Sequence, residues 1–481
     1  MTNILILGAG FGGIRTALDL SRLLRNRVPT SSRILDRIGR SSISLKSGEK
    51  KFRKNNGVKI TVLDRRNFHL FTPSLYEVAT VYGLVEDSFA QYLRGSVAIP
   101  MAEIFENKKI NFVQAEIEEV NLKEKFVKTG GGAKLNFDYL VIALGGVTEF
   151  FGIPGIADYA FDFKDIDNAV GIYKKIREVY EKFRQPRSRR TEDRRNWGRQ
   201  GAERPSEGGG APSEKIRIAV VGGGFTGVEL AAELSCCVEN IIEACKLDKQ
   251  YTQISLFEAG EKILPAVEEK QRKVIEKRLK NLGVQIMVNS PVVEADPDYI
   301  KVKKPSFAKA SEGRDEPFKT DLVIWAGGIR GPRLLENLGL KLSKKGFIEA
   351  NEYLQAINPD GTVDENIFIV GDSGGYIDPK TERPVPATAY IAYRQGAFVA
   401  ENIARALKNE KFRPYKPFYD IWVAPVGGKW AYFHYGVINI KGFWGYLMKQ
   451  LVDLKYFSTI LPFNRALALF FKDLVIFSKN D

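Results

Sequence analysis

Two glycine-rich loops, each directly after a run of apolar β-forming residues, limit the folds available to this chain more than any other feature. The first loop, residues 8–13, reads GAGFGG, and the second, residues 222–227, reads GGGFTG. In such a loop the first glycine permits a tight turn, the second lets the backbone approach a pyrophosphate, and the third lets the following helix pack on the strand. The glycines that we expect to hold the phosphates of two dinucleotides are Gly8, Gly10 and Gly13 in the first loop and Gly222, Gly224 and Gly227 in the second.

The residues on either side of both loops have the pattern of a strand and a helix. Residues 4–7 and 218–221 are typical of buried parallel strands, and residues 14–24 and 228–245 are typical of the helices that follow. The alternative is a pair of tight turns in ordinary α/β units, which the repeated strand, loop and helix make the weaker interpretation. The sequence therefore predicts an α/β fold with two Rossmann-like domains.

An acidic residue follows the second strand of each predicted unit, where ribose hydroxyls are bound. Asp64 comes after residues 58–63, and Glu258 comes after residues 253–257. The alternative for each is a solvated carboxylate at a strand end. Glu258 also bears on the choice of nucleotide, because its charge would repel a 2′-phosphate and the next two residues, Ala259 and Gly260, offer no arginine to receive one. We therefore expect NADH to be preferred over NADPH.

Two further segments resemble each other and are predicted to be return strands beneath the dinucleotides. Residues 139–146 (YLVIALGG) and 322–328 (LVIWAGG) are buried strands that run into small residues, so Gly145 and Gly327 allow close approach of a ligand. A plain buried strand with a glycine turn is the alternative. Residues 366–374 (NIFIVGDSG) end in Gly-Asp, and Asp372 is expected at a flavin ribityl chain or pyrophosphate, or else as the N-cap of the helix after Thr388.

The chain of 481 residues carries a net charge of +14, and much of this excess lies in two polar tracts. Residues 25–57 and 184–215 are rich in Arg, Ser and Gly, and a third polar tract at residues 304–318 interrupts a hairpin-like stretch. The first tract lies between Gly13 of the first loop and Asp64, which are therefore much farther apart than the roughly 20 residues of a compact unit. We expect all three to be surface insertions. No nucleic-acid binding is expected, because aromatic residues do not alternate with the basic ones.

Cysteine and histidine content argues against several other classes of enzyme. The three cysteines lie within residues 236–245 on one predicted helix and form neither a CxxC pair nor a metal-binding spacing. The two histidines, His69 and His434, form no metal cluster or hydrolytic triad. The first residues lack the pattern of a signal peptide, and no apolar run reaches the about 18 residues of a spanning helix. We expect no metal and a catalytic body in a reducing cytoplasm.

The C-terminal residues 437–481 have the pattern of an amphipathic helical segment that binds a membrane surface. A second apolar segment, residues 463–477, follows the first and adds Phe470, Phe471 and Phe477. Aromatic side chains beside Lys and Arg are typical of a monotopic anchor on an anionic surface, and a dimer or core helix is the alternative. The apolar positions at helical spacing are Phe443, Trp444, Leu447, Met448, Leu451 and Leu454, opposite Lys449, Gln450, Asp453 and Lys455.

The order of loop, acid and return strand, repeated and then followed by Gly-Asp, resembles that of the two-dinucleotide-binding-domain flavoproteins. Within them the chain is most similar to type II (alternative) NADH:quinone oxidoreductases, through residues 67–79 (NFHLFTPSLYEVA), residues 222–233 (GGGFTGVELAAE) and the tail. The resemblance implies a discontinuous FAD domain with an inserted NAD(H) domain. The implied boundaries are 1–160 and 360–436 for the FAD domain, 161–359 for the NAD(H) domain and 437–481 for the membrane-binding tail.

The resemblance also implies roles for individual residues. Glu229 lies in the first helical turn after the second loop and is expected at the junction of flavin and nicotinamide; a carboxylate that stabilises a helix N-terminus is the alternative. Thr72, Pro73 and Ala389 are implied as FAD contacts, and His69, close to them in sequence, is expected to be structural. The quinone-side motif of the family, AQxAxQ, appears here as AYIAYRQG, so the implied quinone-binding residues are Tyr390, Arg394 and Gln395, with two glutamines replaced.

The activity implied by the resemblance is FAD-dependent, non-proton-pumping oxidation of NADH with electron transfer to a membrane quinone. The protein would be peripheral, on the cytoplasmic face of the cell membrane. A homodimer is a possible assembly. A soluble NADH-dependent reductase that passes electrons to a ferredoxin-like protein or to oxygen is the alternative enzyme. The alternative that is not an enzyme is a regulatory flavoprotein, which would sense the nicotinamide redox state and bind membranes without rapid turnover.

Overall fold

The computed structural model describes residues 1–25, 57–80, 95–184, 215–245, 251–303, 315–418 and 420–477. The predicted insertions at 25–57, 184–215 and 304–318 therefore lie mostly outside the described residues. The chain divides into two compact units, each made of three stretches of sequence. The first unit comprises Met1–Leu70, Ala98–Val147 and Arg330–Tyr419, and the second comprises Phe71–Val97, Thr148–Ile329 and Asp420–Asp481.

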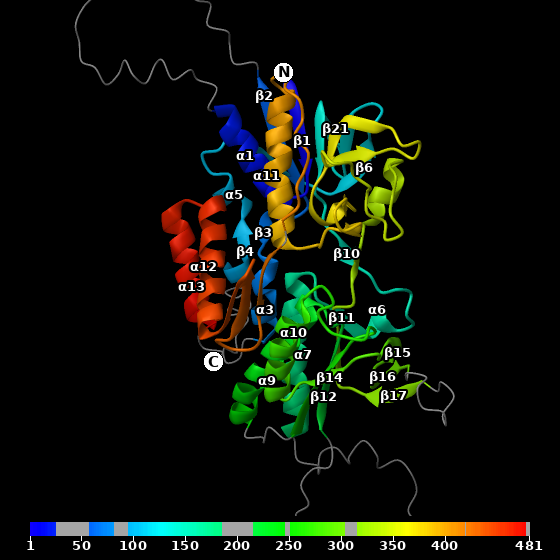
Figure 1. The fold of residues 1–481 in the computed structure, drawn as a ribbon, viewed down its shortest axis with the longest axis vertical. Helices are drawn as coiled ribbons and strands as arrows, with labels where there is room; N and C mark the ends of the chain where they lie inside the picture. Colours follow the sequence, from blue (N-terminus) through cyan, green and yellow to red (C-terminus); the bar gives the residue numbers. More distant parts are fainter. Residues whose placement is uncertain are drawn as a thin grey trace, which may run out of the picture. The chain divides into compact units, whose positions relative to one another are not determined.

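A six-stranded sheet forms the core of the first unit, and its buried strands carry the apolar residues expected of a parallel sheet. The strands follow the order β20 (Gln355–Ile357), β21 (Val363–Ile369), β9 (Tyr139–Ile142), β1 (Thr2–Leu7), β2 (Val58–Asp64) and β5 (Asn111–Gln114). All neighbouring strands are parallel except β20 and β21. Helix α1 (Phe11–Arg25) leaves the first glycine loop and packs beside α11 (Ala389–Ala406), which Figure 1 shows in orange.

Short strands and turns complete the first unit. The pair of β3 and β4 is antiparallel, as are the strands of the small sheet β6, β7 and β8. These elements are β3 (Phe68–Leu70), β4 (Ala98–Pro100), α5 (Met101–Ile104), β6 (Ile117–Asn121), β7 (Phe126–Thr129), β8 (Lys134–Asn136), η4 (Arg333–Leu338), η5 (Gly371–Ser373), β22 (Ile377–Asp378) and β23 (Arg383–Pro384). The chain crosses between the units at β10 (Val147–Thr148) and β19 (Ile329–Arg330).

The second unit repeats the parallel arrangement around its own apolar core. Its five-stranded sheet has the order β11 (Ala160–Asp162), β18 (Leu322–Trp325), β12 (Ile216–Val221), β13 (Thr252–Phe257) and β14 (Gln285–Met287), all parallel. Helix α9 (Phe225–Cys245) leaves the second glycine loop. The remaining helices and small sheet near it are α6 (Ile156–Tyr159), α7 (Ile166–Arg184), α10 (Glu269–Asn281), β15 (Val292–Asp296), β16 (Tyr299–Val302) and β17 (Glu316–Lys319).

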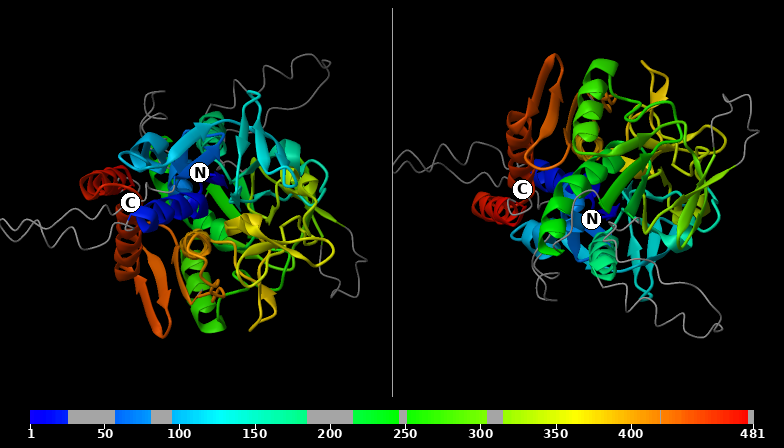
Figure 2. Two further views of the ribbon diagram at one scale, coloured as in Figure 1. Left: turned by 90° about the horizontal axis from the view of Figure 1, so that it is seen from above. Right: turned by 90° about the horizontal axis from the view of Figure 1, so that it is seen from below.

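The other elements of the second unit come from the segment after β3 and from the C-terminal residues. Helix α3 (Leu75–Thr80), after the turn η1 (Thr72–Ser74), packs against α7 and α9. The antiparallel sheet of β24 (Ile421–Pro425), β25 (Ala431–Tyr435) and β26 (Ile438–Gly442) precedes two helices, α12 (Phe443–Ile460) and α13 (Phe463–Phe477). These two helices lie side by side at the red end of the colour scale in Figures 1 and 2.

The structure confirms the predicted α/β class and both Rossmann-like sheets. Predicted strands and helices appear with ends shifted by a few residues, and the interrupted hairpin is present as β16 paired with β17. Strand β17 begins at Glu316, so the end of the tract 304–318 is part of the sheet. The domain boundaries at 160, 359 and 436 remain a prediction about cofactor-binding domains, because the two units are defined by packing alone.

Candidate functional site

The first glycine of each loop stands where a side chain cannot fit. Gly8 and Gly222 have φ of +100° and +115°, a region that L side chains rarely adopt. A Cβ atom on Gly8 would lie 2.2 Å from the Ala143 carbonyl oxygen, and one on Gly222 would lie 2.4 Å from the Ala326 carbonyl oxygen. In both units the loop therefore passes directly over the end of the return strand.

The third glycine of each loop lets the helix approach its strand. A Cβ atom on Gly13 would lie 1.9 Å from the carbonyl oxygen of Gly8, and a Cβ atom on Gly227 would lie 1.9 Å from that of Gly222. Contacts this short with backbone are not relieved by rotating a side chain. Any larger residue would have to move the helix away from the sheet.

The middle glycine of each loop faces open space. Gly10 and Gly224 are exposed, and a Cβ atom on either would meet nothing within 4 Å. Their carbonyl oxygens accept the first helical hydrogen bonds, from the Ile14 and Val228 amides, at 3.0 Å each. Open backbone at the N-terminus of a long helix suits an anionic pyrophosphate, so the residues present fit a dinucleotide at both loops.

The acidic residue of each unit is bonded to the loop itself. Asp64 accepts the Ala9 N–H at 2.6 Å, and Glu258 accepts the Gly223 N–H at 2.7 Å. The other oxygen of each carboxylate accepts the N–H of the residue two positions on, at 2.8 Å and 2.7 Å. Each carboxylate oxygen keeps a lone pair for a ribose hydroxyl. The side chains thus orient the loop as well as being placed for the predicted nucleotide contact.

In the first unit, the return strand, the Gly-Asp segment and α11 meet beside the glycine loop. The Gly145 N–H donates to the Ser373 hydroxyl at 3.0 Å, and the Gly371 N–H donates to Gln395 Oε1 at 2.7 Å. Asp372 lies between these two anchor points and is partly buried. Its alternative assignment as the N-cap of α11 is wrong, because Thr388 caps that helix by accepting the Ile391 N–H at 3.3 Å.

The predicted quinone-binding residues do not share one face of α11. Tyr390 and Arg394 are one helical turn apart, partly buried and exposed respectively, and Ala389 opens the helix. Gln395 is 5% exposed, and its side chain oxygen is already bonded to the Gly371 backbone. The structure therefore groups Tyr390 with Arg394 and gives Gln395 a structural contact.

The segment 67–79 is divided between the two units. His69 lies in the first, with its ring 4.8 Å from that of Phe11 in the glycine loop. Burial lowers the pKa of His69 to about 4, against a hydrogen bond with the Ala9 backbone that raises it, so the ring is neutral at pH 7 and structural. Thr72 and Pro73 belong to the second unit, whereas the other residues predicted to contact FAD belong to the first.

In the second unit the return strand is fixed by Trp325, which is buried next to Gly327. The Trp325 indole donates to the Glu149 carbonyl oxygen at 2.8 Å, and a Cβ atom on Gly327 would lie 2.6 Å from the Trp325 ring. Glycine is thus required at 327 by packing, while the loop end that it forms is partly exposed.

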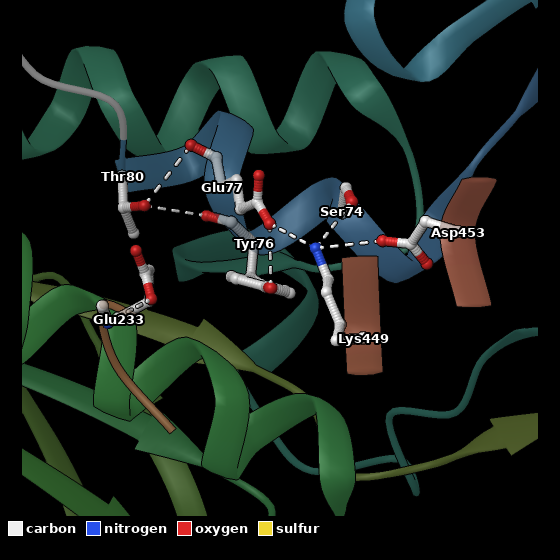
Figure 3. Close-up of polar contacts among 8 residues, drawn as sticks. Ser74, Tyr76, Glu77, Thr80, Glu233, Lys449 and Asp453 are labelled. Atoms are coloured by element: carbon white, nitrogen blue, oxygen red, sulfur yellow. Dashed lines mark hydrogen bonds and ion pairs between the residues drawn. The ribbon is translucent and has the colours of Figure 1, made fainter. Parts of the chain in front are cut away.

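A buried ion cluster joins α3 to α12 within the second unit (Figure 3). The Lys449 ammonium donates to Glu77 Oε1 at 2.7 Å and lies 3.2 Å from Asp453 Oδ2 and 3.5 Å from the Ser74 hydroxyl. The Tyr76 hydroxyl donates to the same Glu77 oxygen at 2.9 Å. Lys449, Glu77 and Asp453 are 3%, 5% and 7% exposed, so this is an ion cluster inside the protein.

Sequence reasoning missed this ion cluster, defined here as Glu77, Lys449 and Asp453. A lysine and an aspartate four residues apart within an aromatic helix were the available signal, but their partner Glu77 lies 372 positions away. A cavity of about 10 Å³, room for about one water molecule, adjoins the cluster. The residues that line it are Ser74, Glu77, Lys449, Gln450, Asp453, Phe457 and Phe470.

Electrostatics in the cluster follow from its burial. Desolvation alone would lower the pKa of Lys449, but Glu77, Tyr76 and Asp453 raise it well above its usual range, so the ammonium stays charged. Burial raises the pKa of Asp453 to about 6, against the opposing effect of Lys449. The buried group is therefore a cation held mainly by Glu77.

Glu229 lies on α9, two residues after the last glycine of the second loop. Burial raises the pKa of Glu229 to about 8; Lys449 acts to lower this value and Asp453 to raise it. One turn further along α9, Glu233 is buried and accepts the Gly428 N–H at 3.3 Å. Glu229 is thus largely a neutral carboxyl at pH 7, next to a nucleotide-type loop.

An aromatic group from β24 and β25 also contacts the second loop. The Trp422 ring lies 5.5 Å from that of Phe225, within the loop, and stacks on Tyr432 at 5.4 Å. His434 lies on the same sheet, with its Nε2 2.7 Å from Asp420 Oδ1. This histidine is held by hydrogen bonds to Asp420, Asn439 and Gln271.

In its middle turns helix α12 buries polar side chains, whereas near its end Phe457 and Ile460 are buried and Lys455 is exposed. Lys449, Gln450 and Asp453 are buried, whereas Trp444 is 67% exposed. Of the helices that the structure describes, none is long and apolar enough to span a membrane. Phe477 lies in α13, and its side chain is outside the described residues. The exposed apolar residues of this region are Tyr435, Val437, Ile438, Phe443, Trp444, Leu447, Leu451, Val452, Phe463 and Phe471.

Comparison with known proteins agrees with this geometry. The family described as pyridine nucleotide-disulphide oxidoreductase matches residues 48–396. A type II NADH:quinone oxidoreductase of Staphylococcus aureus (strain NCTC 8325 / PS 47) is 28% identical over 407 residues, which cover 85% of this chain and 83% of the relative.

Solved structures share the fold over nearly the whole chain. NDH2 from Plasmodium falciparum in complex with NADH has a TM-score of 0.73 at 19% identity and covers 98% of this chain and 97% of that one. The sulfide:quinone oxidoreductase of Aquifex aeolicus has a TM-score of 0.67 at 18% identity and covers 95% and 91%.

Proposed function

The chain belongs to the pyridine nucleotide-disulphide oxidoreductase family, and we propose that it oxidises NADH with a bound FAD and passes the electrons to a quinone. The observation that carries this proposal is the repeated loop, in which an open glycine and a carboxylate bonded to the loop recur in both units. Two such loops suit two dinucleotides, a resident cofactor and a substrate. The Staphylococcus aureus relative, named as a type II NADH:quinone oxidoreductase, supports the donor and the acceptor.

We assign FAD to the first unit. When bound, FAD supplies hydride acceptance and electron transfer. Backbone at Gly8, Gly10 and Gly13 would hold the pyrophosphate at the start of α1, and Asp64 would bind the ribose. The other residues of this unit proposed to hold the cofactor are Gly145, Asp372 and Ala389, whereas Thr72 and Pro73, which the resemblance implies, belong to the second unit.

We assign NADH to the second unit, through Gly222, Gly224, Gly227, Glu258 and Gly327. Glu258 lies against the loop with both oxygens on backbone N–H groups, so a 2′-phosphate would meet a fixed negative charge. Glu229 is the proposed catalytic residue. Its burial keeps the carboxyl neutral at pH 7, so it can donate a hydrogen bond at the junction of flavin and nicotinamide and adds no negative charge there.

The acceptor site is proposed at Tyr390 and Arg394. A phenol hydroxyl and a guanidinium both donate hydrogen bonds, as the replaced glutamines of the family motif do, and suit a quinone carbonyl. Gln395 retains its amide N–H groups for the same purpose, although its oxygen is bonded to Gly371. Tyr390 and Arg394 would thus present two hydrogen-bond donors to the quinone head group from one face of α11.

Membrane attachment is proposed through the outward face of α12 and the β25–β26 turn. Val437, at that turn, is 95% exposed, and Phe443 and Trp444 open the helix at 56% and 67%. Exposed aromatic and aliphatic side chains beside Lys441 and Lys455 suit an anionic bilayer surface. The protein would then be peripheral, on the cytoplasmic face of the cell membrane; a homodimer formed through the same face is the competing outcome.

Steady-state assays and vesicle binding test these assignments. The purified protein should oxidise NADH with a short-chain quinone, and Leu447→Glu with Leu451→Glu should release it from anionic vesicles. Activity with a long-chain quinone in the bilayer should then fall much further than activity with the soluble analogue. Loss of a dimer without loss of vesicle binding would count against the membrane assignment.

A second candidate is a soluble NADH-dependent reductase that passes electrons to a ferredoxin-like protein or to oxygen. The replacement of both motif glutamines by Tyr390 and Arg394 favours it. Reduction of an electron-carrier protein at a rate above that of any quinone tested would establish this candidate.

A further inference from the structure

We propose that Phe151 is a binding residue for the nicotinamide half of NADH in the second unit, with its ring packed against that half of the bound dinucleotide. This inference rests on the proposed assignment of NADH to the second glycine loop. It adds an aromatic contact to a site that the loop and Glu258 otherwise form from backbone and one carboxylate.

Phe151 has a backbone conformation that bulky residues rarely adopt. Its φ is +52°, and that of the next residue, Gly152, is +65°. The Ile153 N–H donates to the Phe150 carbonyl oxygen at 3.0 Å, which makes these two residues the centre of a tight turn. Turns with positive φ at both central positions are normally made of Gly, Asn and Asp. A phenylalanine at the first of these positions is therefore strained.

Burial in the core does not account for this strain. Among the described residues, Leu264 and Leu354 are the other large apolar side chains with positive φ, and each is 1% exposed. Their burial offsets the strain of their backbone. The Phe151 side chain, in contrast, is 56% exposed, so more than half of its surface faces solvent. Strain that persists without such burial is typical of residues that hold a ligand.

Neighbouring contacts hold the turn at the end of the return strand β18. The Trp325 indole donates to the Glu149 carbonyl oxygen at 2.8 Å, and the Glu149 N–H donates to the Gly328 carbonyl oxygen at 3.0 Å. The Glu149 carboxylate in turn accepts the Phe151 N–H at 2.7 Å. The Phe151 ring lies edge-on to that of Trp325, with centroids 6.4 Å apart, and a Cβ atom on Gly328 would lie 3.4 Å from its Cζ. The ring is thus fixed beside the end of β18.

The order of the strands places the nicotinamide half of a dinucleotide at this end of β18. The loop that would hold the pyrophosphate follows β12, and Glu258, which would bind the adenosine ribose, follows β13 on one side of it. Strand β18 pairs with β12 on the other side, and Gly327 and Gly328 come after it. The three strands are parallel, so all these groups lie along one edge of the sheet. A dinucleotide held by the loop and Glu258 therefore extends its other half towards Gly328 and Phe151.

An aromatic ring suits this half of the substrate. Nicotinamide is planar and packs on a phenyl ring, and in NAD⁺ it also carries a positive charge that the face of such a ring attracts. The contact would hold the nicotinamide half in place for hydride transfer. It asks no acid, base or redox chemistry of Phe151.

Binding of two nucleotide probes to the purified holoenzyme tests the inference. NAD⁺ carries both halves of the dinucleotide, whereas ADP carries only the adenosine half and its phosphates. Phe151→Asn should weaken NAD⁺ binding about fivefold and leave ADP binding within about twofold, as measured by isothermal titration calorimetry. Phe151→Tyr keeps the ring and should retain the wild-type affinity for NAD⁺. Tyr159→Asn, which removes an exposed aromatic side chain from α6 of the same unit, is the matched control and should change neither affinity.

Thermal unfolding separates a ligand contact from a purely structural role. Asparagine adopts positive φ readily, so Phe151→Asn should relieve the strain and keep the unfolding midpoint at or above that of the wild type. A phenylalanine retained for packing alone would give the opposite result. The midpoint would then fall, and the affinities for NAD⁺ and ADP would fall together.

Equal loss of NAD⁺ and ADP affinity in Phe151→Asn, or an unchanged NAD⁺ affinity, would overturn the inference. Neither probe requires turnover or a quinone. Selective loss of NAD⁺ affinity in a protein that fails to reduce quinones would contradict the proposed acceptor alone, and normal quinone reduction with unchanged NAD⁺ affinity in Phe151→Asn would contradict the inference alone. Failure of the wild type to bind NAD⁺ would overturn both.

Discussion

The two glycine loops make matching hydrogen bonds to their carboxylates and helices, yet their surroundings differ. In the first unit, α11 is pressed onto the loop, because a Cβ atom on Gly396 would lie 2.4 Å from the Gly12 carbonyl oxygen. A Cβ atom on Gly12 would also lie 2.3 Å from the side chain of Val370, which follows β21. In the second unit, the position equivalent to Gly12 is Thr226, which is exposed. At this position the first loop is thus enclosed by its own helix layer and the second is open, although the Trp422 ring of β24 lies against Phe225 in the second loop.

One loop motif can therefore serve two kinds of ligand. An enclosed loop suits a cofactor that stays bound, because many groups must move together before it leaves. An open loop suits a substrate that enters and leaves in every turnover. We therefore connect the enclosure by α11 with resident FAD, and the open second loop with NADH.

The largest expected effect comes from matched substitutions at the third glycine. Gly13→Ala would place a methyl group 1.9 Å from backbone, and so would Gly227→Ala. Gly13→Ala should yield protein with less than about a tenth of the wild-type flavin, whereas Gly227→Ala should keep its flavin and lose reduction by NADH. The ratio of flavin absorbance to protein and a stopped-flow trace with NADH measure the two outcomes. Loss of flavin in both variants would contradict the assignment of FAD to the first loop and NADH to the second.

Exchange of the residues that differ between the loops should have the next largest effect. Gly12→Thr should separate α1 from α11, lower the free energy of unfolding by about 1–3 kcal/mol and weaken FAD binding. Thr226→Gly should cost about 1 kcal/mol or less and leave the KM for NADH within a few fold. Denaturant titration and steady-state kinetics check both. Equal destabilisation by the two variants would contradict the idea that only the first loop is enclosed.

The two loops should also differ in their response to pH. His69 beside the first loop has a pKa near 4 in the folded protein against 6.5 as reference, so its contribution to stability is lost as pH falls from 6.5 towards 4. Glu229 beside the second loop has a pKa near 8 against 4.5, so its contribution is lost as pH rises from 4.5 through 8. Each slope is at most about 1.4 kcal/mol per pH unit.

Limited proteolysis across pH, with cleavage sites assigned to the units, measures this response. The first unit should become sensitive in acid and the second in base. Glu229→Gln should remove most of the alkaline sensitivity and leave the acid limb as it was. An alkaline limb that persists unchanged in this variant would show that another group carries it.

The smallest expected effect concerns nucleotide choice at the second loop. Glu258→Gln removes the charge and retains one of the two side-chain oxygens that accept the Gly223 and Gly260 N–H groups. The preference for NADH over NADPH, measured as the ratio of kcat/KM values, should fall about tenfold. Asp64→Asn, the matched change in the first unit, should leave that ratio alone. An unchanged ratio in Glu258→Gln would place the discrimination elsewhere.

The repeated loops and their acids could be predicted from sequence because they are local. A run of β-formers, three glycines at fixed spacing and a carboxylate after the next strand lie within short stretches, and the parallel pairing of β1 with β2 and of β12 with β13 follows from them. The alternative of Asp372 as an N-cap is wrong, because Asp372 lies in η5 and Thr388 caps α11.

The ion cluster could not be predicted, because its partners are brought together only by folding. The helical pattern of α12 identified its apolar positions, but pattern alone does not say which face points inward. Lysine and aspartate are normally exposed, and their burial here depends on Glu77, from a six-residue helix near the start of the second unit. The family motif likewise predicts Gln395 as a quinone-binding residue, whereas in the structure its side-chain oxygen accepts the Gly371 N–H.

An anaerobic titration of the purified yellow protein tests whether FAD bound at the first loop is reduced by NADH bound at the second loop and reoxidised by a quinone. NADH is added in steps while flavin absorbance is recorded, and a short-chain quinone follows under the same conditions. The absorbance should bleach fully with about one NADH per flavin and recover when the quinone is added. Protein that stays free of flavin after incubation with FAD, or flavin that NADH does not bleach, would contradict the account.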